Sequence, residues 1–242
     1  MHKNIRTFDY GGIHPIDNKK GTKDIPIKTA PLPSRVIIPL SQHIGRPARP
    51  IVSVGEEVKT GQKIAEQEGY ISAAIHASIS GSIKSIEKRR HPLGTAVLSI
   101  EIESDGKDTK DQSLEPLKTD SIPKEIIIQR IKDAGIVGLG GAAFPTHVKL
   151  IPPEEERIDT LIINGAECEP MLTCDFRSML EKPHELVRGI AIILSLFNKD
   201  TKAIIAIEEN KREAFNVLDA IIKHYPQISL QLLKIKYPQG AE

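Results

Sequence analysis

The second half of the chain alternates two apolar patterns. Short, nearly unbroken apolar runs predict three buried strands, at 160–163, 201–207 and 228–235. Apolar residues at helical spacing predict three helices, at 124–134, 183–197 and 211–225. Gly135 follows the first of these helices, and Pro183 occupies the first position of the second, where proline is tolerated. Alternating helices and strands predict an α/β fold with a mostly parallel sheet.

Residues 51–103 have a different pattern. Short stretches rich in Val and Ile are separated by glycines such as Gly55 and Gly61, and residues 96–103 alternate apolar and polar side chains. Closely spaced short strands with glycine turns predict a small β barrel or sandwich. Ile83 and Ile86 do not fit a strict two-residue alternation, so the pattern leaves the register of that strand open.

Two segments lack periodicity. Residues 1–50 are rich in Pro and Gly and predict an irregular, extended lead-in. Residues 104–123 are polar and include Pro116 and Pro123, which predicts a linker. The sequence therefore predicts four parts: the lead-in 1–50, a β module at 51–103, the linker 104–123 and an α/β domain at 124–242.

Composition excludes several classes of protein. The 242 residues include 33 Lys+Arg and 32 Asp+Glu, and the net charge of +1 argues against a nucleic-acid binder. Only 4% of the residues are aromatic, so stacking platforms for bases are not expected. The longest apolar stretch, 186–197, includes Arg188 and Gly189 and is too short for a membrane span, which needs about 20 residues. Two cysteines and no leader pattern are typical of a reducing compartment.

Residues 135–149 contain the first chemical signal, called the glycine loop below. Gly135, Gly138, Gly140 and Gly141 place four glycines within seven residues, which lets backbone N–H groups approach a ligand closely. A helix beginning at Pro145 would add its N-terminus, as at phosphate sites. The dinucleotide-binding fingerprint requires a preceding strand, whereas a helix is predicted here. A glycine-rich connector without a ligand remains the alternative.

The second signal, residues 163–170, directly follows a predicted buried strand and is called the acidic loop. The carboxyl end of a strand is where α/β sheets bind ligands. Asn164 offers amide donors and acceptors, and Glu167 and Glu169 can accept hydrogen bonds from hydroxyl groups. The alternative is a solvated acidic turn, since clusters of charged residues usually face water.

Metal and acid–base sites find little support in the sequence. Cys168 and Cys174 are too few for a zinc or iron–sulfur site, and the histidines form no metal-binding motif. His147 draws attention only because it lies beside the glycine loop. The sequence predicts no catalytic side chain and no metal ligand.

Several phrases together resemble one family, the RnfC component of the Rnf ion-translocating ferredoxin:NAD oxidoreductase complex. The resemblance runs nearly end to end, through 11–15, 39–45, 135–150, 159–170, 172–175, 207–211 and 237–240. The glycine and acidic loops are also similar to those of the flavin-carrying subunit of respiratory complex I, where the loops bind FMN and NADH stacks on it. The resemblance thus implies an FMN/NADH-binding domain.

Carried over to the glycine loop, the resemblance implies roles for five residues. Gly138, Gly140 and Gly141 would let the backbone follow the flavin. Phe144 would border the nicotinamide side, and Lys149 would place positive charge near the anionic groups of the flavin.

In the second half of the domain the resemblance implies that Asn164 contacts FMN. Glu167 and Glu169 would face hydroxyl groups of flavin or NADH, and Gly240 and Glu242 would line the flavin. Ala166 replaces an aspartate of the complex I motif, which removes one expected flavin contact.

The β module resembles a lipoyl/biotinyl-type barrel-sandwich hybrid. Such carriers present a modifiable lysine on an exposed hairpin, but the corresponding residues 68–73 contain none. The hairpin is therefore interpreted as a docking surface and not as a swinging arm.

The function that the resemblance implies is electron entry or exit in a membrane-bound translocase complex, with hydride exchanged between NAD(H) and FMN and electrons passed to [4Fe-4S] clusters. Partners would be the membrane and ferredoxin-like Rnf subunits, and the location the cytoplasmic face of the membrane, without a span. The cluster motifs of the family are absent from these residues, so the chain is interpreted as a truncated and inactive part of the family's full-length protein. A docking module without redox activity, or a related electron-transfer flavoprotein such as a cobalamin reductase, remain alternatives. The transported ion, the electron acceptor and the direction of transfer are not readable from the sequence.

Overall fold

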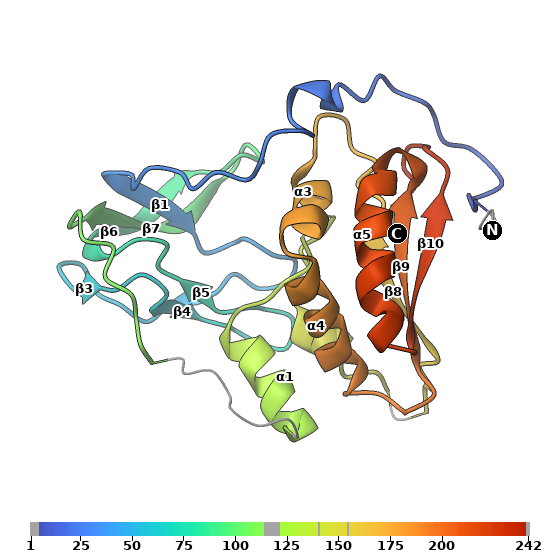
Figure 1. The fold of residues 1–242 in the computed structure, drawn as a ribbon. Helices are drawn as coiled ribbons and strands as arrows, with labels where there is room; N and C mark the ends of the chain where they lie inside the picture. Colours follow the sequence, from blue (N-terminus) through green and yellow to red (C-terminus); the bar gives the residue numbers. More distant parts are fainter. Residues whose placement is uncertain (1–4, 114–121, 140, 154, 241–242) are drawn as a thin grey trace. The chain divides into compact units, whose positions relative to one another are not determined.

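A computed structural model describes residues 5–113, 122–139, 141–153 and 155–240 (Figure 1). The chain forms two compact units. The β unit is continuous, Ala30–Pro153, whereas the α/β unit combines Met1–Thr29 with Glu154–Glu242. The fold class predicted from the sequence, a β module followed by an α/β domain with a parallel sheet, is confirmed.

The β unit contains two antiparallel sheets. The four-stranded sheet has the order β1 (Arg35–Pro39), β7 (Ala96–Ser104), β6 (Gly81–Arg90) and β3 (Glu57–Val58). The three-stranded sheet has the order β2 (Arg49–Pro50), β4 (Lys63–Glu66) and β5 (Ile75–His76). Isoleucines from both sheets fill the core between them and are at most 1% exposed, namely Ile64, Ile83, Ile100 and Ile102.

A bulge in β6 explains the irregular spacing of its isoleucines. Ile83 pairs with Ile102 and Ser85 with Glu101, so β6 has one extra residue at this point. The extra residue turns Ile83 and Ile86 toward the same core, although they are three residues apart.

The predicted linker at 104–123 begins too early. Residues 105–111 pack on the β unit, where Asp105 accepts a hydrogen bond from the Ser80 hydroxyl at 2.7 Å and Asp108 accepts one from Thr60 at 2.6 Å. Thr60 also pairs with the backbone of this segment. The polar residues that suggested a linker thus form hydrogen bonds with side chains that lie next to the strands of the β unit. Residues 114–121 lie outside the described part of the chain.

Two helices after this segment also belong to the β unit. They are α1 (Lys124–Asp133), which confirms the predicted helix, and α2 (Thr146–Lys149), which has only four residues. Lys63 forms an ion pair with Asp133 of α1 at 3.1 Å. The units therefore divide at 153/154 and 29/30, not within 104–123.

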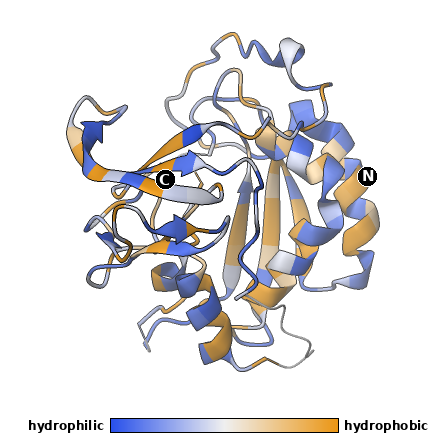
Figure 2. Cartoon of the chain, turned by 90° about the vertical axis from the view of Figure 1, so that its left-hand side faces the viewer, coloured by the Kyte–Doolittle hydropathy of each residue, from blue (hydrophilic) through white to orange (hydrophobic). Residues whose placement is uncertain are grey.

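The α/β unit is built on a parallel sheet with the order β10 (Ile228–Leu233), β9 (Lys202–Glu208) and β8 (Thr160–Gly165). Its core is formed by one face of the sheet and by α3 (Cys174–Glu181), α4 (Pro183–Leu194) and α5 (Arg212–Ile221). Figure 2 shows the strands largely orange and the helices with many blue positions. Three short 3-10 turns complete the unit, η1 (Lys19–Gly21), η2 (Glu209–Lys211) and η3 (Ile222–His224).

The three predicted strands and the predicted helices at 183–197 and 211–225 are present, but β8 is not buried as predicted, since Ile162 is 69% exposed, and α3 was not predicted. It has eight residues, and the buried ones are Phe176 and Met179, too few for a clear apolar period. Lys182 separates α3 from α4 because the residue before a proline disfavours helical backbone angles.

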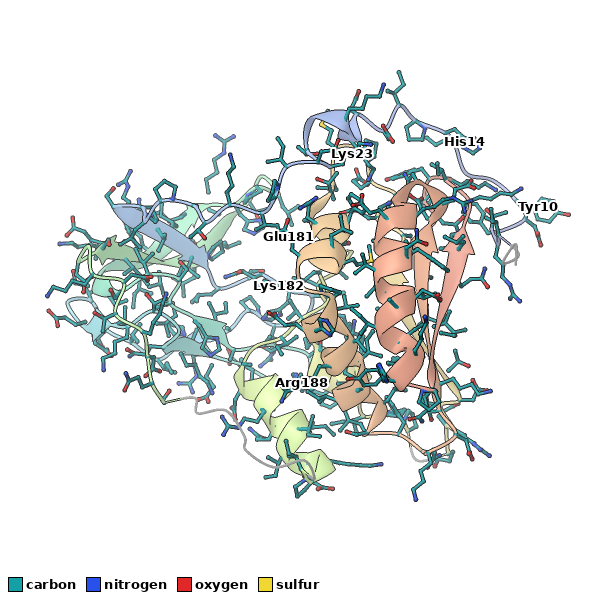
Figure 3. The ribbon with its side chains drawn as sticks, in the orientation of Figure 1. Tyr10, His14, Lys23, Glu181, Lys182 and Arg188 are labelled. Atoms are coloured by element: carbon teal, nitrogen blue, oxygen red, sulfur yellow. The ribbon has the colours of Figure 1, made fainter. Side chains whose placement is uncertain are left out.

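Residues 5–29, called the N-terminal strap, run along the α/β unit. Arg6 pairs with Leu233 and Ile13 with Tyr237. The backbone N–H of Ile27 donates to the Glu181 carboxylate at 3.0 Å, and Arg177 donates to the Lys23 carbonyl. Lys23 and Glu181 are labelled in Figure 3. Tyr10 and His14 project outward from the strap in the same view. The predicted irregular lead-in is thus an ordered element of the α/β unit up to residue 29.

The described helices are all too short or too polar to cross a membrane.

Candidate functional site

The glycine loop is a tight turn closed by backbone hydrogen bonds. The N–H of Gly138 donates to the Phe144 carbonyl at 2.9 Å, and the N–H of Thr146 donates to the Ile136 carbonyl at 3.0 Å. The predicted helix after Pro145 is the single turn α2. The loop therefore ends in a tight turn and a single helical turn, and not at the N-terminus of a long helix.

The tip of the glycine loop is open. Leu139 is 98% exposed. Gly141 has φ +54°, and no heavy atom lies within 4 Å of the position where a Cβ would be. At Gly138, a Cβ would lie 3.1 Å from the Lys149 ammonium nitrogen, so this cation lies beside the loop. Phe144 is half-buried, and Gly140 lies outside the described residues.

Two other residues of this region have structural roles. Gly135 has φ +63°, and a Cβ there would collide with the carbonyl of Ala74, so this glycine serves close packing. His147 is buried, and burial together with the charge of Lys132 lowers its pKa. His147 therefore does not face a ligand at the exposed tip.

The middle of the acidic loop, residues 165–167, is buried, whereas Asn164 and Glu169 are exposed. The loop begins in the last residues of β8, and Glu167 is 9% exposed with φ +47°. One carboxylate oxygen of Glu167 accepts the Asp175 N–H at 2.7 Å, whereas the other has no partner among the described residues. Burial raises the pKa of Glu167. The alternative of a solvated acidic turn is wrong for Glu167.

Two lysines that the sequence did not single out hold this loop. The Lys211 ammonium donates to the Ala166 carbonyl at 2.7 Å and to Glu208 at 3.0 Å. The Lys19 ammonium donates to the carbonyls of Glu167, Leu172 and Glu169. No local pattern could reveal these contacts, since Lys19 and Glu167 are 148 residues apart.

Asn164 and Gly240, both predicted to contact flavin, lie together. The Asn164 amide donates to the Gly240 carbonyl at 2.8 Å, and its oxygen accepts from the Ala166 N–H at 3.2 Å. A Cβ at Gly240 would lie 2.9 Å from that oxygen. Glu169 is exposed, and its carboxylate raises the pKa of Tyr237, with which it hydrogen-bonds. Glu242 lies outside the described residues.

Glu167, Cys174 and Asp175 bring their ligand atoms within 4.8 Å of one another. Burial and the two carboxylates raise the pKa of the Cys174 thiol. The ammonium groups of Lys19 and Lys211 bind carbonyls of the same loop and oppose a further cation. We assign no metal to this group.

The sequence matches two families in tandem. Residues 7–107 match the RnfC barrel sandwich hybrid domain, and residues 131–242 match the Nuo51 FMN-binding domain. The chain belongs to the RnfC family. The first match begins in the N-terminal strap of the α/β unit and continues into the β unit, and the second match begins in the β unit and continues through the α/β unit.

Named relatives are similar over almost all of the chain. The C component of the proton-translocating ferredoxin:NAD(+) oxidoreductase complex of Clostridium ljungdahlii is 46% identical over 238 residues, which is 96% of this chain and 50% of that protein. The C component of the Na(+)-translocating ferredoxin:NAD(+) oxidoreductase complex of Acetobacterium woodii is 42% identical over 233 residues, 96% of this chain and 52% of that protein. The chain thus spans about half the length of these relatives.

The structure divides the predicted FMN-contacting residues into two sets. Gly138, Gly141, Phe144 and Lys149 belong to the β unit. Asn164, Glu167, Glu169 and Gly240 belong to the α/β unit. In the β unit, Gly138 lies beside Lys149 and Phe144, and in the α/β unit Asn164 lies beside Gly240.

Proposed function

We propose that this chain binds FMN through its glycine loop and its acidic loop and, as part of the longer protein, takes part in electron entry or exit in an Rnf complex. Hydride would be exchanged with NAD(H), and single electrons would pass to iron–sulfur clusters outside these residues. The protein positions the cofactor, and bound FMN supplies the conversion between two-electron and one-electron transfer.

The observation that carries the proposal is the open turn beside Lys149. The Lys149 ammonium lies next to Gly138, where the absence of a side chain leaves room for this cation. The flavin phosphate carries negative charge, and an ammonium group forms charge-assisted hydrogen bonds to phosphate oxygens. The residues present in the glycine loop therefore fit the anionic end of FMN.

The acidic loop offers complementary groups. Asn164 is exposed but has its orientation fixed by Gly240 and Ala166. Glu169 is exposed and can accept hydrogen bonds from ribityl or ribose hydroxyl groups. Glu167 retains one carboxylate oxygen without a protein partner among the described residues. These groups suit a ligand with several hydroxyl groups, as FMN and NADH both are.

The test measures the Kd of the full-length protein for FMN from the change in flavin fluorescence on binding. Lys149→Met keeps the length of the side chain and removes its charge. A charge-assisted hydrogen bond is worth about 1.5–3 kcal/mol, so we expect the Kd for FMN to rise about 10- to 100-fold. Lys124→Met, at the exposed start of α1, is the matched control and should leave the Kd unchanged. Equal affinity of Lys149→Met and the parent would contradict the assignment of the glycine loop.

The exposed hairpin of the β unit favours a second role, docking to other subunits. Its residues 68–73 contain no lysine for a carrier group, whereas Tyr70 is 68% exposed. Exposed aromatic side chains are enriched at protein interfaces. Such docking would hold the chain at the cytoplasmic face of the membrane without a span of its own.

The docking role is tested by recovery of the full-length protein with membranes from cells that express the other Rnf subunits. Tyr70→Ser should lower this recovery without changing FMN binding. Lys88→Ser, at an exposed position of β6, should change neither. Full recovery of Tyr70→Ser would contradict the docking role and leave the flavin proposal intact.

A further inference from the structure

Lys19 is a buried cation on the N-terminal strap. The other residues between 11 and 29 are exposed. Lys19 is 6% exposed, whereas its neighbours Lys20 and Lys23 are exposed. Burial of an ammonium group is costly unless its protons are satisfied. A lysine on an exposed strap could extend into water instead, so its inward orientation calls for a specific role.

The Lys19 ammonium donates only to backbone carbonyls of the acidic loop and of the residues that follow it. The distances are 2.7 Å to Glu167, 3.0 Å to Glu169 and 2.7 Å to Leu172. An ammonium group has three N–H donors, and each of these three carbonyls can accept one. The chain between 167 and 172 therefore curls around a single nitrogen atom.

This curl requires unusual backbone angles. Glu167 has φ +47° and Met171 has φ +69°, and neither is glycine. Such angles cost free energy and persist only where surrounding contacts enforce them. The strap supplies a further contact, since the Met171 N–H donates to the Asp17 carbonyl at 2.7 Å.

The charges around Lys19 do not form a simple ion pair with it. Burial lowers the pKa of Lys19, and the charge of Lys211 lowers it further, while Glu167, Glu208 and Asp17 act in the opposite direction. Lys211 holds the Ala166 carbonyl, immediately before the segment that Lys19 holds. The two ammonium groups thus fix successive parts of one loop.

We propose that Lys19 is a positioning residue for flavin binding: its ammonium sets the path of the backbone from Glu167 to Leu172 and thereby the directions of the Glu167 and Glu169 side chains. This inference rests on the proposed function of the acidic loop. The N-terminal strap is then part of the cofactor site although it contains none of the predicted flavin contacts.

The first experiment measures the loop without flavin. Hydrogen exchange of the Met171 and Asp175 amides is compared between the full-length parent protein and Lys19→Met, which keeps the side-chain length without the charge. We expect exchange of both amides to accelerate at least 10-fold in the variant. The matched control Lys28→Met, at an exposed position of the strap, should leave both rates unchanged. Unchanged rates in Lys19→Met would overturn the inference.

The second experiment measures the flavin. We expect Lys19→Met to raise the Kd for FMN at least 10-fold and to shift the flavin midpoint potential. The control Glu181→Gln weakens the contact of the strap at Ile27 but leaves Lys19 in place, so it should not shift the potential. If the strap only stabilises the fold, the parent, Lys19→Met and Glu181→Gln will have the same flavin midpoint potential. That result would overturn the inference. If Lys19→Met does not fold, the Kd for FMN and the midpoint potential are measured for Lys19→Gln, which lacks the charge and one of the three N–H donors of the ammonium group. Values equal to those of the parent would overturn the inference.

The two hypotheses fail differently. A parent protein that binds no FMN contradicts the proposed function, and the exchange rates still decide whether Lys19 holds the loop. A parent that binds FMN together with a Lys19→Met variant of equal affinity and potential contradicts only the role of Lys19.

Discussion

The glycine loop and the acidic loop differ in what shapes them. The glycine loop is shaped by missing side chains: its tip is exposed, and open space surrounds Gly141. The acidic loop is shaped by contacts from elsewhere in the chain, because Lys19 and Lys211 bind its carbonyls in the protein interior. Replacing the exposed Leu139 side chain at the tip of the glycine loop should therefore leave stability unchanged, whereas a substitution that removes a contact of the acidic loop should lower it.

The largest effect on stability is expected from Lys211→Met. Lys211 is 3% exposed and pairs with Glu208, which is 1% exposed. Removing one partner of a buried ion pair leaves a buried charge and costs about 3–5 kcal/mol. We expect a loss of this size in the free energy of unfolding, measured by urea denaturation. Lys223→Met, at an exposed position in η3, is the control. A loss no larger than that of the control would show that the interior contacts do not stabilise the acidic loop.

The next largest effect separates two glycines of the glycine loop. In Gly135→Ala the new Cβ would collide with the Ala74 carbonyl, and the backbone has φ +63°. Gly141→Ala has a similar φ of +54° but open space. A left-handed backbone costs a residue with a Cβ about 1–2 kcal/mol, so Gly141→Ala should lose about that much and Gly135→Ala distinctly more. Thermal unfolding of both variants checks the order, and equal losses would contradict the packing role of Gly135.

A smaller effect concerns the pH dependence of the acidic loop. Burial raises the pKa of Glu167 in the folded protein above its value in the unfolded chain. The folded state therefore binds this proton more tightly, and Glu167 lowers stability as pH rises from its unfolded pKa through its raised folded pKa. Glu167→Gln removes this dependence. We expect the stability of the variant relative to the parent to increase from pH 4 to pH 7, as measured by urea denaturation at each pH. A constant difference would mean that the carboxylate is not desolvated.

The smallest effect is expected at the tip of the glycine loop. Leu139 is 98% exposed, and substitutions at such positions change stability by less than about 0.5 kcal/mol. Leu139→Ser should thus unfold at the same urea concentration as the parent. A larger loss would mean that Leu139 has a packing partner and that the tip is less open than the comparison with the acidic loop requires.

The sequence predicted the elements that have local causes. The strands β8, β9 and β10 follow from short apolar runs, and α4 and α5 from helical spacing. Asn164 and the glycines were identified because their motifs are contiguous. Contacts between distant segments were not predictable in this way. Lys19 depends on residues about 150 positions away. The predicted linker begins too early because Asp105 and Asp108 bind Ser80 and Thr60, which lie 25 and 48 positions earlier in the chain.

The interruption of the α/β unit by Ala30–Pro153 has a consequence for biosynthesis. Domains tend to fold as units while the chain is being made, starting from the N-terminus. The β unit is complete when Pro153 leaves the ribosome, but the strap must wait for the Tyr237 backbone and the carbonyls of the acidic loop. The strap, which is synthesised before the β unit, is thus among the last segments to find its place. The side chain of Ile5, which packs against the core of the α/β unit in the folded protein, remains available to chaperones throughout that interval.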